Sequence, residues 1–420
     1  MRKLFVFVLV GMIPLAAHGQ THPLQALIEA ARANSPSLKD LLPKTLFDLK
    51  ERGASAVWGQ DFLFAVETDK TASVSLDGNA PETMTRVPGS NLWYLVKKMR
   101  IGVTHNYQFY ADGQSMGQAY RYDVAGYGPD SYPQPGVPKG ALSEKKTITS
   151  KIYPDWNPEY WVYVSPGYDP SRGAALMVWQ DGQNLARGDL YAMRLFTVTE
   201  NLVHQKLIPP MIHVLVAPKD GTRHRSIEYD TVSDRYGRFL LEEILPEVEK
   251  TYKIRSDGYS RGIGGQSSGG ICSLNVAWYF PDKFSRVLSN IGSYTALQWR
   301  PEEHLDGGNI YPFKIRREPK RNIRVWLADG SEDQESPRAG SWPLQNIQLA
   351  NSLKLRGYDF HFRFGDGMHS SGQGSLDLPE ALAWLWRDYD PGKSAQDYEM
   401  EPSERAKPVF RVKISNRDAW

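Results

Sequence analysis

The chain has 420 residues, with 50 Lys and Arg against 48 Asp and Glu and a formal net charge of +2 at pH 7. This balance, without a basic stripe or a polybasic run, predicts binding neither to nucleic acid nor to an anionic membrane. No cluster of Cys and His residues has the spacing of a metal site, and we expect no cofactor.

Residues 1–19 predict a secretory signal peptide. Arg2 and Lys3 precede a short apolar run, and Ala17 and Gly19 place small residues before a cleavage site. The run is too short for a comfortable membrane span. The cleavage region holds no cysteine, so we expect no lipid anchor. We therefore expect an exported protein, periplasmic or extracellular.

The region up to residue 138 predicts a small front domain. Residues 20–50 begin with an amphipathic helix from Pro23 to Ala33. Residues 51–125 hold short strand-like runs between turn residues, which is typical of a β-sandwich. These runs are Phe62–Glu67, Ala72–Gly78, Leu92–Val96 and Tyr107–Gly113. Residues 126–138 are rich in Pro and Gly and predict a linker.

Trp93 and Tyr94 in this front domain leave two alternatives open. If both rings are exposed, they stack on sugar faces and give the sandwich a contact with polysaccharide. Alternating aromatic residues in a small sandwich belong more often to its core. On the first alternative the front domain aids engagement of a polymeric substrate more than the chemistry.

The most informative motif is Gly-Gln-Ser-Ser-Gly-Gly, from Gly265 to Gly270. A strand-like run precedes it, and apolar residues at helical spacing follow it up to Pro281. In that context G-x-S-x-G predicts a nucleophile elbow, in which the glycines allow a sharp turn and Ser267 is the nucleophile. Because the chain has 36 glycines, a chance Gly-Ser turn stays an alternative until partners are found.

A serine nucleophile needs a histidine as base and an acid that orients it. His369 follows the alternating strand Tyr358–Phe364 in a glycine-bearing loop, where a base would be presented. His361 lies within that strand, and His304 lies in a charged loop. We therefore favour His369.

The acid is expected after the strand candidate Ile323–Ala328. Asp333 is favoured, since a side chain three residues past Gly330 can fold back toward the imidazole. Asp329 is the second candidate. A third alternative is that Asp333 only caps the next helix, a common task of loop aspartates.

An oxyanion hole needs two convergent backbone donors. The first is expected to be the N–H of Ser268, the residue after the nucleophile. The second is expected in the loop after the strand Ala174–Trp179, at Gln180, Asp181 or Gly182.

Several motifs together resemble the esterase D group of α/β-hydrolases. They are Trp161–Tyr168, Gln180–Gln183, Arg225–Tyr229, Phe239–Glu249, the elbow, and Gly367–His369. This group includes enterochelin esterases and the feruloyl and acetyl esterases of carbohydrate esterase family one. Met368 departs mildly from the pattern, where relatives often have a second glycine.

The resemblance implies an α/β-hydrolase fold over residues 139–390, a mostly parallel sheet with helices on both faces. It places Ser267, Asp333 and His369 at the triad positions. It also implies that the front domain is similar to the immunoglobulin-like module of enterochelin esterases, itself similar to carbohydrate-binding modules.

Two further substrate contacts are considered. The resemblance implies that Arg225 faces the substrate; the alternative is an ion pair with Glu228 at i,i+3. Three aromatic residues of the segment Gly292–Phe313 either wall an aromatic acyl pocket or pack in the core. They are Tyr294, Trp299 and Tyr311.

The lone cysteine and the carboxyl-terminal residues carry no predicted chemistry. Cys272 falls on the helix after the elbow and is expected to be a small core residue. Residues 391–420 predict a charged tail, in which Val409–Ile414 is a candidate edge strand.

The sequence thus predicts an exported serine carboxylic-ester hydrolase that acts on a small ester or an oligosaccharide ester. Hydroxycinnamoyl (feruloyl) or acetyl esters of plant cell-wall carbohydrate are the favoured substrates. The alternatives are a siderophore esterase of the enterochelin type, an acyltransferase with a sugar acceptor, and a sugar-binding protein without turnover.

Overall fold

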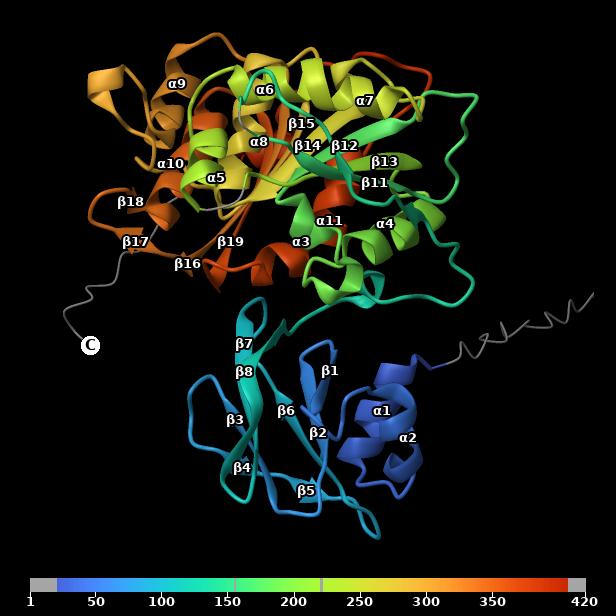
Figure 1. The fold of residues 1–420 in the computed structure, drawn as a ribbon. Coiled ribbons are helices and arrows are strands. Elements are labelled where there is room, and N and C mark those ends of the chain that lie inside the picture. Colours follow the sequence, from blue (N-terminus) through green and yellow to red (C-terminus); the bar gives the residue numbers. More distant parts are fainter. Residues whose placement is uncertain (1–20, 155, 220–221, 407–420) are drawn as a thin grey trace, which may run out of the picture.

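The computed structural model describes residues 21–154, 156–219 and 222–406. The predicted signal peptide and the candidate edge strand Val409–Ile414 lie outside the described residues. In Figure 1 the larger α/β domain lies above the smaller front module. Over the described ranges, no helix combines the length and apolar character that a membrane crossing requires.

The front module begins with two helices, α1 (Pro23–Arg32) and α2 (Leu38–Thr45). The predicted helix over Pro23–Ala33 is therefore confirmed. Its buried residues Leu27, Ile28 and Ala31 pack in one cluster with Leu63 and Ala65 of the adjoining sheet. The amphipathic pattern thus gives α1 an apolar stripe that covers a sheet face.

Two antiparallel sheets of four strands form the rest of the front module. The first has the order β1 (Ala54–Trp58), β2 (Asp61–Glu67), β6 (Leu92–Lys98) and β5 (Thr85–Arg86). The second has the order β4 (Glu82–Thr83), β3 (Ala72–Leu76), β7 (Thr104–Ala111) and β8 (Gln114–Val124). Residues of both sheets share one buried cluster, in which the rings of Phe64 and Tyr107 meet edge to face at 5.1 Å.

The two aromatic residues weighed for sugar stacking differ in their surroundings. Tyr94 is buried, and its hydroxyl donates to Asn34 Oδ1 at 2.7 Å. Trp93 is half-buried and donates from Nε1 to the carbonyl of Thr68 at 3.0 Å, with Arg86 over its ring. Tyr94 is therefore a core residue, and Trp93 alone keeps a partly open face.

A nine-stranded mixed sheet forms the centre of the larger domain. Its order is β10-β11-β13-β12-β14-β15-β16-β19, with β9 paired to β11. The antiparallel strands are β9 (Ala141–Leu142), β10 (Lys146–Thr147) and β11 (Glu159–Val164). The parallel strands are β13 (Met211–Val216), β12 (Ala175–Gln180), β14 (Arg261–Gln266), β15 (Arg286–Asn290), β16 (Arg324–Glu332) and β19 (Asp359–Met368). A separate small ribbon pairs β17 (Glu335–Ser336) with β18 (Gly340–Ser341).

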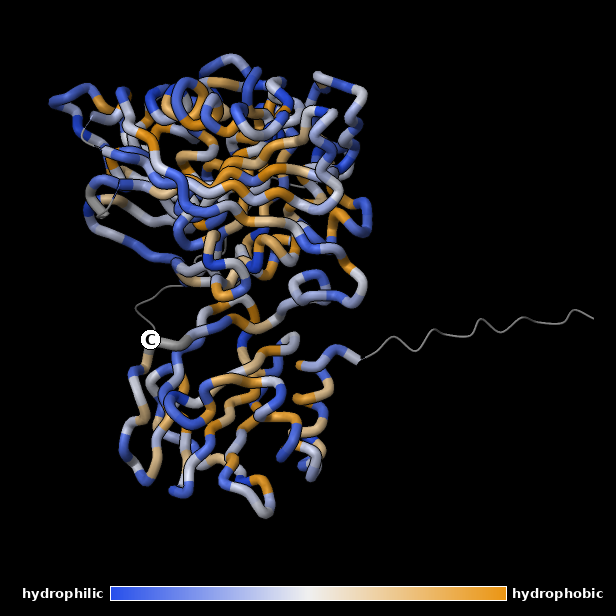
Figure 2. Tube along the Cα trace, turned by 45° about the vertical axis from the view of Figure 1, so that its right-hand side comes forward, coloured by the Kyte–Doolittle hydropathy of each residue, from blue (hydrophilic) through white to orange (hydrophobic). Residues whose placement is uncertain are grey.

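Helices cover both faces of this sheet, as predicted. Along β12, Leu176 and Val178 enter one core, whereas Met177 and Trp179 enter the other, because successive strand residues point to opposite faces. The first core includes α6 (Arg235–Phe239), the π-helical turn η3 (Leu240–Ile244), α7 (Leu245–Glu249), α8 (Ser268–Tyr279), α9 (Tyr311–Arg317) and α10 (Trp342–Leu355). The second includes α3 (Gly182–Leu185), α4 (Leu195–His204) and α11 (Gly372–Trp386). Figure 2 shows the apolar segments concentrated along the strands inside both bodies.

The remaining helices are α5 (Thr222–Tyr229), which follows β13, and α12 (Pro402–Ala406). Cys272 on α8 is fully buried, which confirms its prediction as a core residue.

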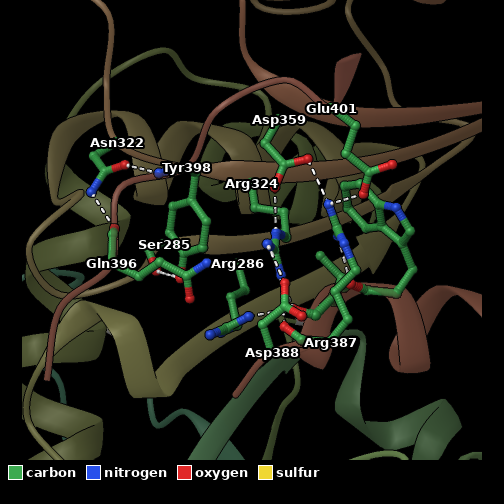
Figure 3. A network of polar contacts seen from close by, with 12 residues as sticks. Ser285, Arg286, Asn322, Arg324, Asp359, Arg387, Asp388, Gln396, Tyr398 and Glu401 are labelled. Atoms are coloured by element: carbon green, nitrogen blue, oxygen red, sulfur yellow. Dashed lines mark hydrogen bonds and ion pairs between the residues drawn. The ribbon is translucent and has the colours of Figure 1, made fainter. Parts of the chain in front are cut away.

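The segment after residue 390 differs from the predicted charged tail. Tyr398 is buried, with Arg324 and Arg286 lying 4.8 and 5.5 Å from its ring, and its hydroxyl lies 3.1 Å from Ser285 Oγ. Figure 3 shows this network. Arg387 joins it by bonding both Asp359 and Glu401.

The buried arginines explain why this segment packs against the domain. Arg286 and Arg324 begin β15 and β16 at the amino-terminal edge of the sheet, where both are buried. The guanidinium of Arg286 is stabilised there by aromatic faces and carbonyl oxygens, and that of Arg324 also pairs with the buried carboxylate of Asp359 at 2.6 Å. Residues 391–401 complete this cover, which charge composition alone does not reveal.

Replacing Tyr398 tests that cover. We expect Tyr398→Ala to lower the free energy of unfolding by about 3–5 kcal/mol, as for other buried aromatic residues. Tyr398→Phe keeps the ring and loses one hydrogen bond, for about 1 kcal/mol. Phe47→Ala, at a ring that is 81% exposed, is the control and should change little. Urea denaturation measures all three; equal midpoints for Tyr398→Ala and wild type would show that the segment does not stabilise the domain.

Candidate active site

Ser267 lies at the turn between β14 and α8, with φ 57° and ψ −124°. A non-glycine residue with positive φ is uncommon and needs support from its surroundings. The N–H of Ser267 donates to the carbonyl of Asn290 at 3.0 Å, and its carbonyl accepts from Ser293 N–H at 3.1 Å. These bonds hold the serine at the carboxyl-terminal edge of the sheet, in the geometry that the elbow motif predicts.

The flanking glycines are required by close backbone contacts. A Cβ on Gly265 would lie 2.6 Å from the carbonyl carbon of Gly269, and one on Gly269 would lie 3.0 Å from Gln180 Cβ. Larger residues at either position would push the strand and the helix apart.

Ser267, His369 and Asp333 are joined in one line of hydrogen bonds. Ser267 Oγ lies 2.7 Å from His369 Nε2, and His369 Nδ1 lies 2.5 Å from Asp333 Oδ1. The carboxylate of Asp333 is fully buried, whereas the imidazole is partly exposed. The order of contacts is the one that a serine nucleophile, its base and an orienting acid require.

The competing residues occupy other positions. The helix after Asp333 is capped by Ser341, whose hydroxyl accepts from Leu344 N–H, so the alternative that Asp333 only caps this helix is wrong. His361 stacks on Trp326 at 4.3 Å within the sheet, as predicted. His304 follows a short turn at the surface.

The close approach of β16 and β19 brings the acid beside the base. Gly330 pairs with Gly365, and a bulge follows between Gly330 and Glu332. A Cβ on Gly330 would lie 2.0 Å from the carbonyl oxygen of Gly367, so only glycine fits. Because β16 runs on to Glu332, Asp333 is the first residue after the strand, and it meets His369, the first residue after β19.

The predicted oxyanion donors differ in their hydrogen bonds. The N–H of Asp181 donates to the hydroxyl of Tyr229 at 3.2 Å, which engages it elsewhere. Gly182 begins α3, where an N–H has no partner within the helix. A Cβ on Gly182 would lie 2.3 Å from the backbone of Leu215. Ser268 opens α8 in the same way, so the N–H groups of Ser268 and Gly182 have no partner within their helices, whereas the N–H of Asp181 bonds Tyr229.

Arg225 bonds the oxyanion loop rather than Glu228. Its Nε and Nη2 donate to the two carboxylate oxygens of Asp181 at 2.7 and 2.6 Å, and Nη2 also reaches the carbonyl of Gln266 at 3.3 Å. Glu228 instead accepts from the N–H of Lys219. The predicted i,i+3 pair is therefore wrong, and a substrate contact of Arg225 stays a prediction.

Arg225 balances negative charge near the nucleophile. The Asp181 carboxylate lies close to the start of α8, with Oδ2 3.4 Å from a Cβ placed on Gly269. Burial raises the pKa of Glu228 to about 8, so this neighbour is mostly uncharged at neutral pH. Burial also raises the pKa of Asp230 to about 6, although hydrogen bonds from Ser226 and Ser268 oppose the rise.

Sequence reasoning missed three residues near Ser267, namely Ser293, Trp342 and Tyr191. Ser293 Oγ lies 3.3 Å from Ser267 Oγ and accepts from Trp342 Nε1 at 3.1 Å. The Trp342 ring meets the imidazole of His369 edge to face at 5.6 Å. The hydroxyl of Tyr191 donates to Gln266 Oε1 at 3.2 Å. Only the position of Ser293 after β15 offered a hint, because the carboxyl ends of parallel strands meet at one edge.

The predicted aromatic acyl pocket is wrong for two of its three members. Tyr294 and Tyr311 are fully buried, and their hydroxyls bond Ser289 and Asn275 in the core. Trp299 is 55% exposed. Its loop is tied to α5 by Gln298, which donates to Ser226 Oγ.

The front module reaches the loops that carry the acid and the base. Arg100 donates to Glu332 Oε1 at 3.0 Å and to Asp366 Oδ2 at 3.3 Å. Glu332 directly precedes Asp333, and Asp366 lies three residues before His369. The upper end of β7 and β8 in Figure 1 accordingly meets the larger domain near β16, β19 and α11.

A tyrosine of the front module, Tyr122, lies within electrostatic range of Tyr191. Burial raises the pKa of Tyr191 to about 12, and the hydroxyl of Tyr122 is among the groups that add to the rise. Tyr122 belongs to β8 and is 55% exposed. The front module therefore approaches Tyr191, which bonds Gln266 directly before the nucleophile.

Comparison with known families decides the assignment. A family model described as a putative esterase matches residues 153–385. The chain belongs to this esterase family. Iron(III) enterobactin esterase of Escherichia coli (strain K12) is 29% identical over 229 residues, which cover 54% of this chain and 53% of that protein. The chain thus spans about half the length of the curated relatives it matches.

Solved structures share the architecture at low sequence identity. The enterobactin esterase FES from Shigella flexneri aligns with a TM-score of 0.55 and 19% identity, over 80% of this chain and 97% of that chain. A family-one ferulic acid esterase from Anaeromyces mucronatus aligns with a TM-score of 0.47 and 18% identity, over 61% and 94%. The first likeness confirms the α/β-hydrolase fold predicted for the larger domain.

The charge balance at Asp181 is testable by substitution. Arg225→Gln leaves the Asp181 carboxylate unpaired near the predicted oxyanion site, and kcat should fall about 10- to 100-fold with a smaller change in KM. Asp181→Asn in the same chain should restore much of the loss. Arg238→Gln, at a surface pair with Glu242, is the control. A rise in KM alone, without rescue, would instead make Arg225 a substrate-binding residue.

Proposed function

We propose that this chain is an exported carboxylic-ester hydrolase that works through an acyl-enzyme on Ser267. The observation that carries this proposal is the line of contacts from Ser267 through His369 to Asp333, at an elbow between a parallel strand and a helix. Membership of the esterase family supports the same chemistry.

Acylation begins when Ser267 Oγ attacks the ester carbonyl carbon while its proton passes to His369 Nε2. The electron pair of the C=O bond moves onto oxygen, and the N–H groups of Ser268 and Gly182 stabilise that oxyanion. The intermediate collapses, the C–O bond to the alcohol breaks, and the leaving oxygen takes the proton from His369.

Deacylation repeats these steps with water. Water attacks the acyl carbon while His369 takes its proton, and Ser267 Oγ leaves with that proton as the acid is released. Asp333 accepts from the Nδ1–H of His369 throughout, which keeps the Nε2 lone pair toward Ser267 and stabilises the imidazolium.

For the substrate we propose an ester with a phenolic acyl group. The hydroxyl of Tyr191 bonds Gln266, the residue before Ser267, and its partly buried ring suits an aromatic acyl group beside the nucleophile. A feruloyl ester of plant cell-wall carbohydrate is the first candidate from the sequence; an acetyl ester of the same carbohydrate, which has no phenolic group, is the alternative. The curated relatives named iron(III) enterobactin esterase favour a second candidate, a catecholate siderophore ester.

We further propose that the front module is immunoglobulin-like and serves as a wall of the active site. Its two antiparallel sheets with one shared core support the first part. Its ion pairs from Arg100 to Glu332 and Asp366 support the second. A sugar-binding protein without turnover is disfavoured, because such a protein has no need of the aligned serine, histidine and aspartate.

A substrate panel tests the proposed activity. We expect kcat/KM to be highest on a feruloylated xylo-oligosaccharide, lower on methyl ferulate, and abolished on both in Ser267→Ala, since loss of a triad member typically costs about 10⁴-fold or more. Ferric enterobactin is the third substrate. Efficient turnover of ferric enterobactin alone would exclude the carbohydrate ester. A folded Ser267→Ala that keeps a tenth of the activity would refute the mechanism.

Arg100→Ala tests the wall. Because Arg100 contacts the acid and base loops, we expect kcat/KM to fall by the same factor, about 3- to 10-fold, on methyl ferulate and on the oligosaccharide ester. Lys97→Ala, which breaks a pair with Glu82 inside the front module, is the matched control. A loss confined to the oligosaccharide would show that the module binds carbohydrate instead.

A further inference from the structure

A second buried carboxyl group lies behind Asp333. Asp329 is 1% exposed and Asp333 is 4% exposed. Asp329 Oδ1 accepts from Gly330 N–H at 2.7 Å, and Asp333 Oδ1 accepts from Gln334 N–H and meets His369 Nδ1, each at 2.5 Å. The Oδ2 atom of each carboxyl group is buried, and no hydrogen bond from the described residues reaches it.

The charged groups on the surrounding elements do not compensate two carboxylates here. On β19, Arg363 bonds Glu380 and Asp377. From the front module, Arg100 is taken up by Glu332 and Asp366 at the surface. On α10 the amide of Asn346 hydrogen-bonds Asp329, which opposes the rise of its pKa less than burial and Asp333 promote it, and this amide carries no charge. Strand β15 places Asn290 beside Ala328.

Two adjacent buried carboxyl groups without a cation cannot both ionise. One proton between them removes the repulsion and supplies both unpartnered oxygens with a hydrogen bond. His369 approaches Asp333, so Asp333 is the group that is needed as a carboxylate. The proton therefore belongs on Asp329.

We propose that Asp329 stays protonated at neutral pH and donates a hydrogen bond from Oδ2 to Asp333 Oδ2, as a positioning residue for the acid of the triad. This inference rests on the proposed function for its catalytic consequence. Burial, followed by the hydrogen bond and charge of Asp333, raises the pKa of Asp329 well above its usual range.

The protonated Asp329 has two effects on the base. It fixes the rotamer of Asp333, because Oδ2 gains a donor while Oδ1 faces His369. It also limits the charge of the pair to −1, since a second carboxylate would raise the pKa of the imidazole and leave less of it free to act as a base near neutral pH.

Asp329→Asn is the decisive variant. Its amide can still donate a hydrogen bond to Asp333, and it is neutral, as a protonated carboxyl group is. The acid limb of the pH profile of kcat/KM should then stay in place, with activity within about threefold of wild type. If Asp329 is ionised in the wild type, removing its charge would move the acid limb down by about one pH unit, which would overturn the proposal.

Asp329→Ala removes the donor. We expect kcat to fall about 10- to 100-fold and the acid limb to move to higher pH, because Asp333 Oδ2 loses its partner. Equal activity and equal pH profiles of Asp329→Ala and Asp329→Asn would contradict the donor role. If the alanine variant does not fold, the asparagine variant still decides the protonation state.

Infrared difference spectroscopy provides a readout that does not depend on turnover. At pH 7 the C=O stretch of a protonated carboxyl group should be lost between wild type and Asp329→Asn, but not between wild type and Asp366→Asn, which changes an exposed carboxylate. An unchanged band in Asp329→Asn would refute the inference even in an active enzyme. If the band disappears in Asp329→Asn but the wild-type protein hydrolyses no ester, the protonation of Asp329 stands and only the proposed function is refuted.

Discussion

The strained conformation of Ser267 is the constraint on which the rest of the site depends. A serine with φ 57° is stable only where its neighbours hold the backbone, and here Asn290 and Ser293 of the adjacent β15 segment bond both of its peptide groups. Those bonds require β15 beside β14, and the turn requires the glycines at 265 and 269. The position of the nucleophile therefore depends on both the sheet order and the two glycines.

The electrostatics of the site follow from burial with few cations. Arg225 forms an ion pair with Asp181, and burial raises the pKa of Glu228 and Asp230. The two buried carboxyl groups behind the base also lack a cation among the described residues, and we infer that a proton on Asp329 reduces their charge instead. A site built in this way limits the negative charge around Ser267, which favours an oxyanion in the transition state.

Much of this arrangement was predictable from local sequence. The elbow, the helix after it and the preference for Asp333 and His369 follow from spacing and turn chemistry. These features depend on residues close together in the chain, where periodicity and glycine positions carry the information.

The features that sequence reasoning missed depend on partners far apart in the chain. Arg225 has a carboxylate three residues away, yet it bonds Asp181, 44 positions earlier. Tyr398 lies in a charged stretch, but two buried arginines more than 70 residues upstream give its ring a place in the core. Tyr294 and Tyr311 are aromatic residues near the site that pack inward. Spacing rules cannot rank such contacts, because the fold decides which residues meet.

The identity of the nucleophile is the central claim, and mass spectrometry of the labelled, digested protein tests it most directly. The wild-type chain is incubated with a fluorophosphonate, digested, and the modified peptide sequenced. The account predicts one adduct, on Ser267, and none on Ser293, whose hydroxyl lies 3.3 Å away without a contact to the imidazole in the described structure. An adduct on Ser293, or no adduct at all in a folded protein, would contradict it.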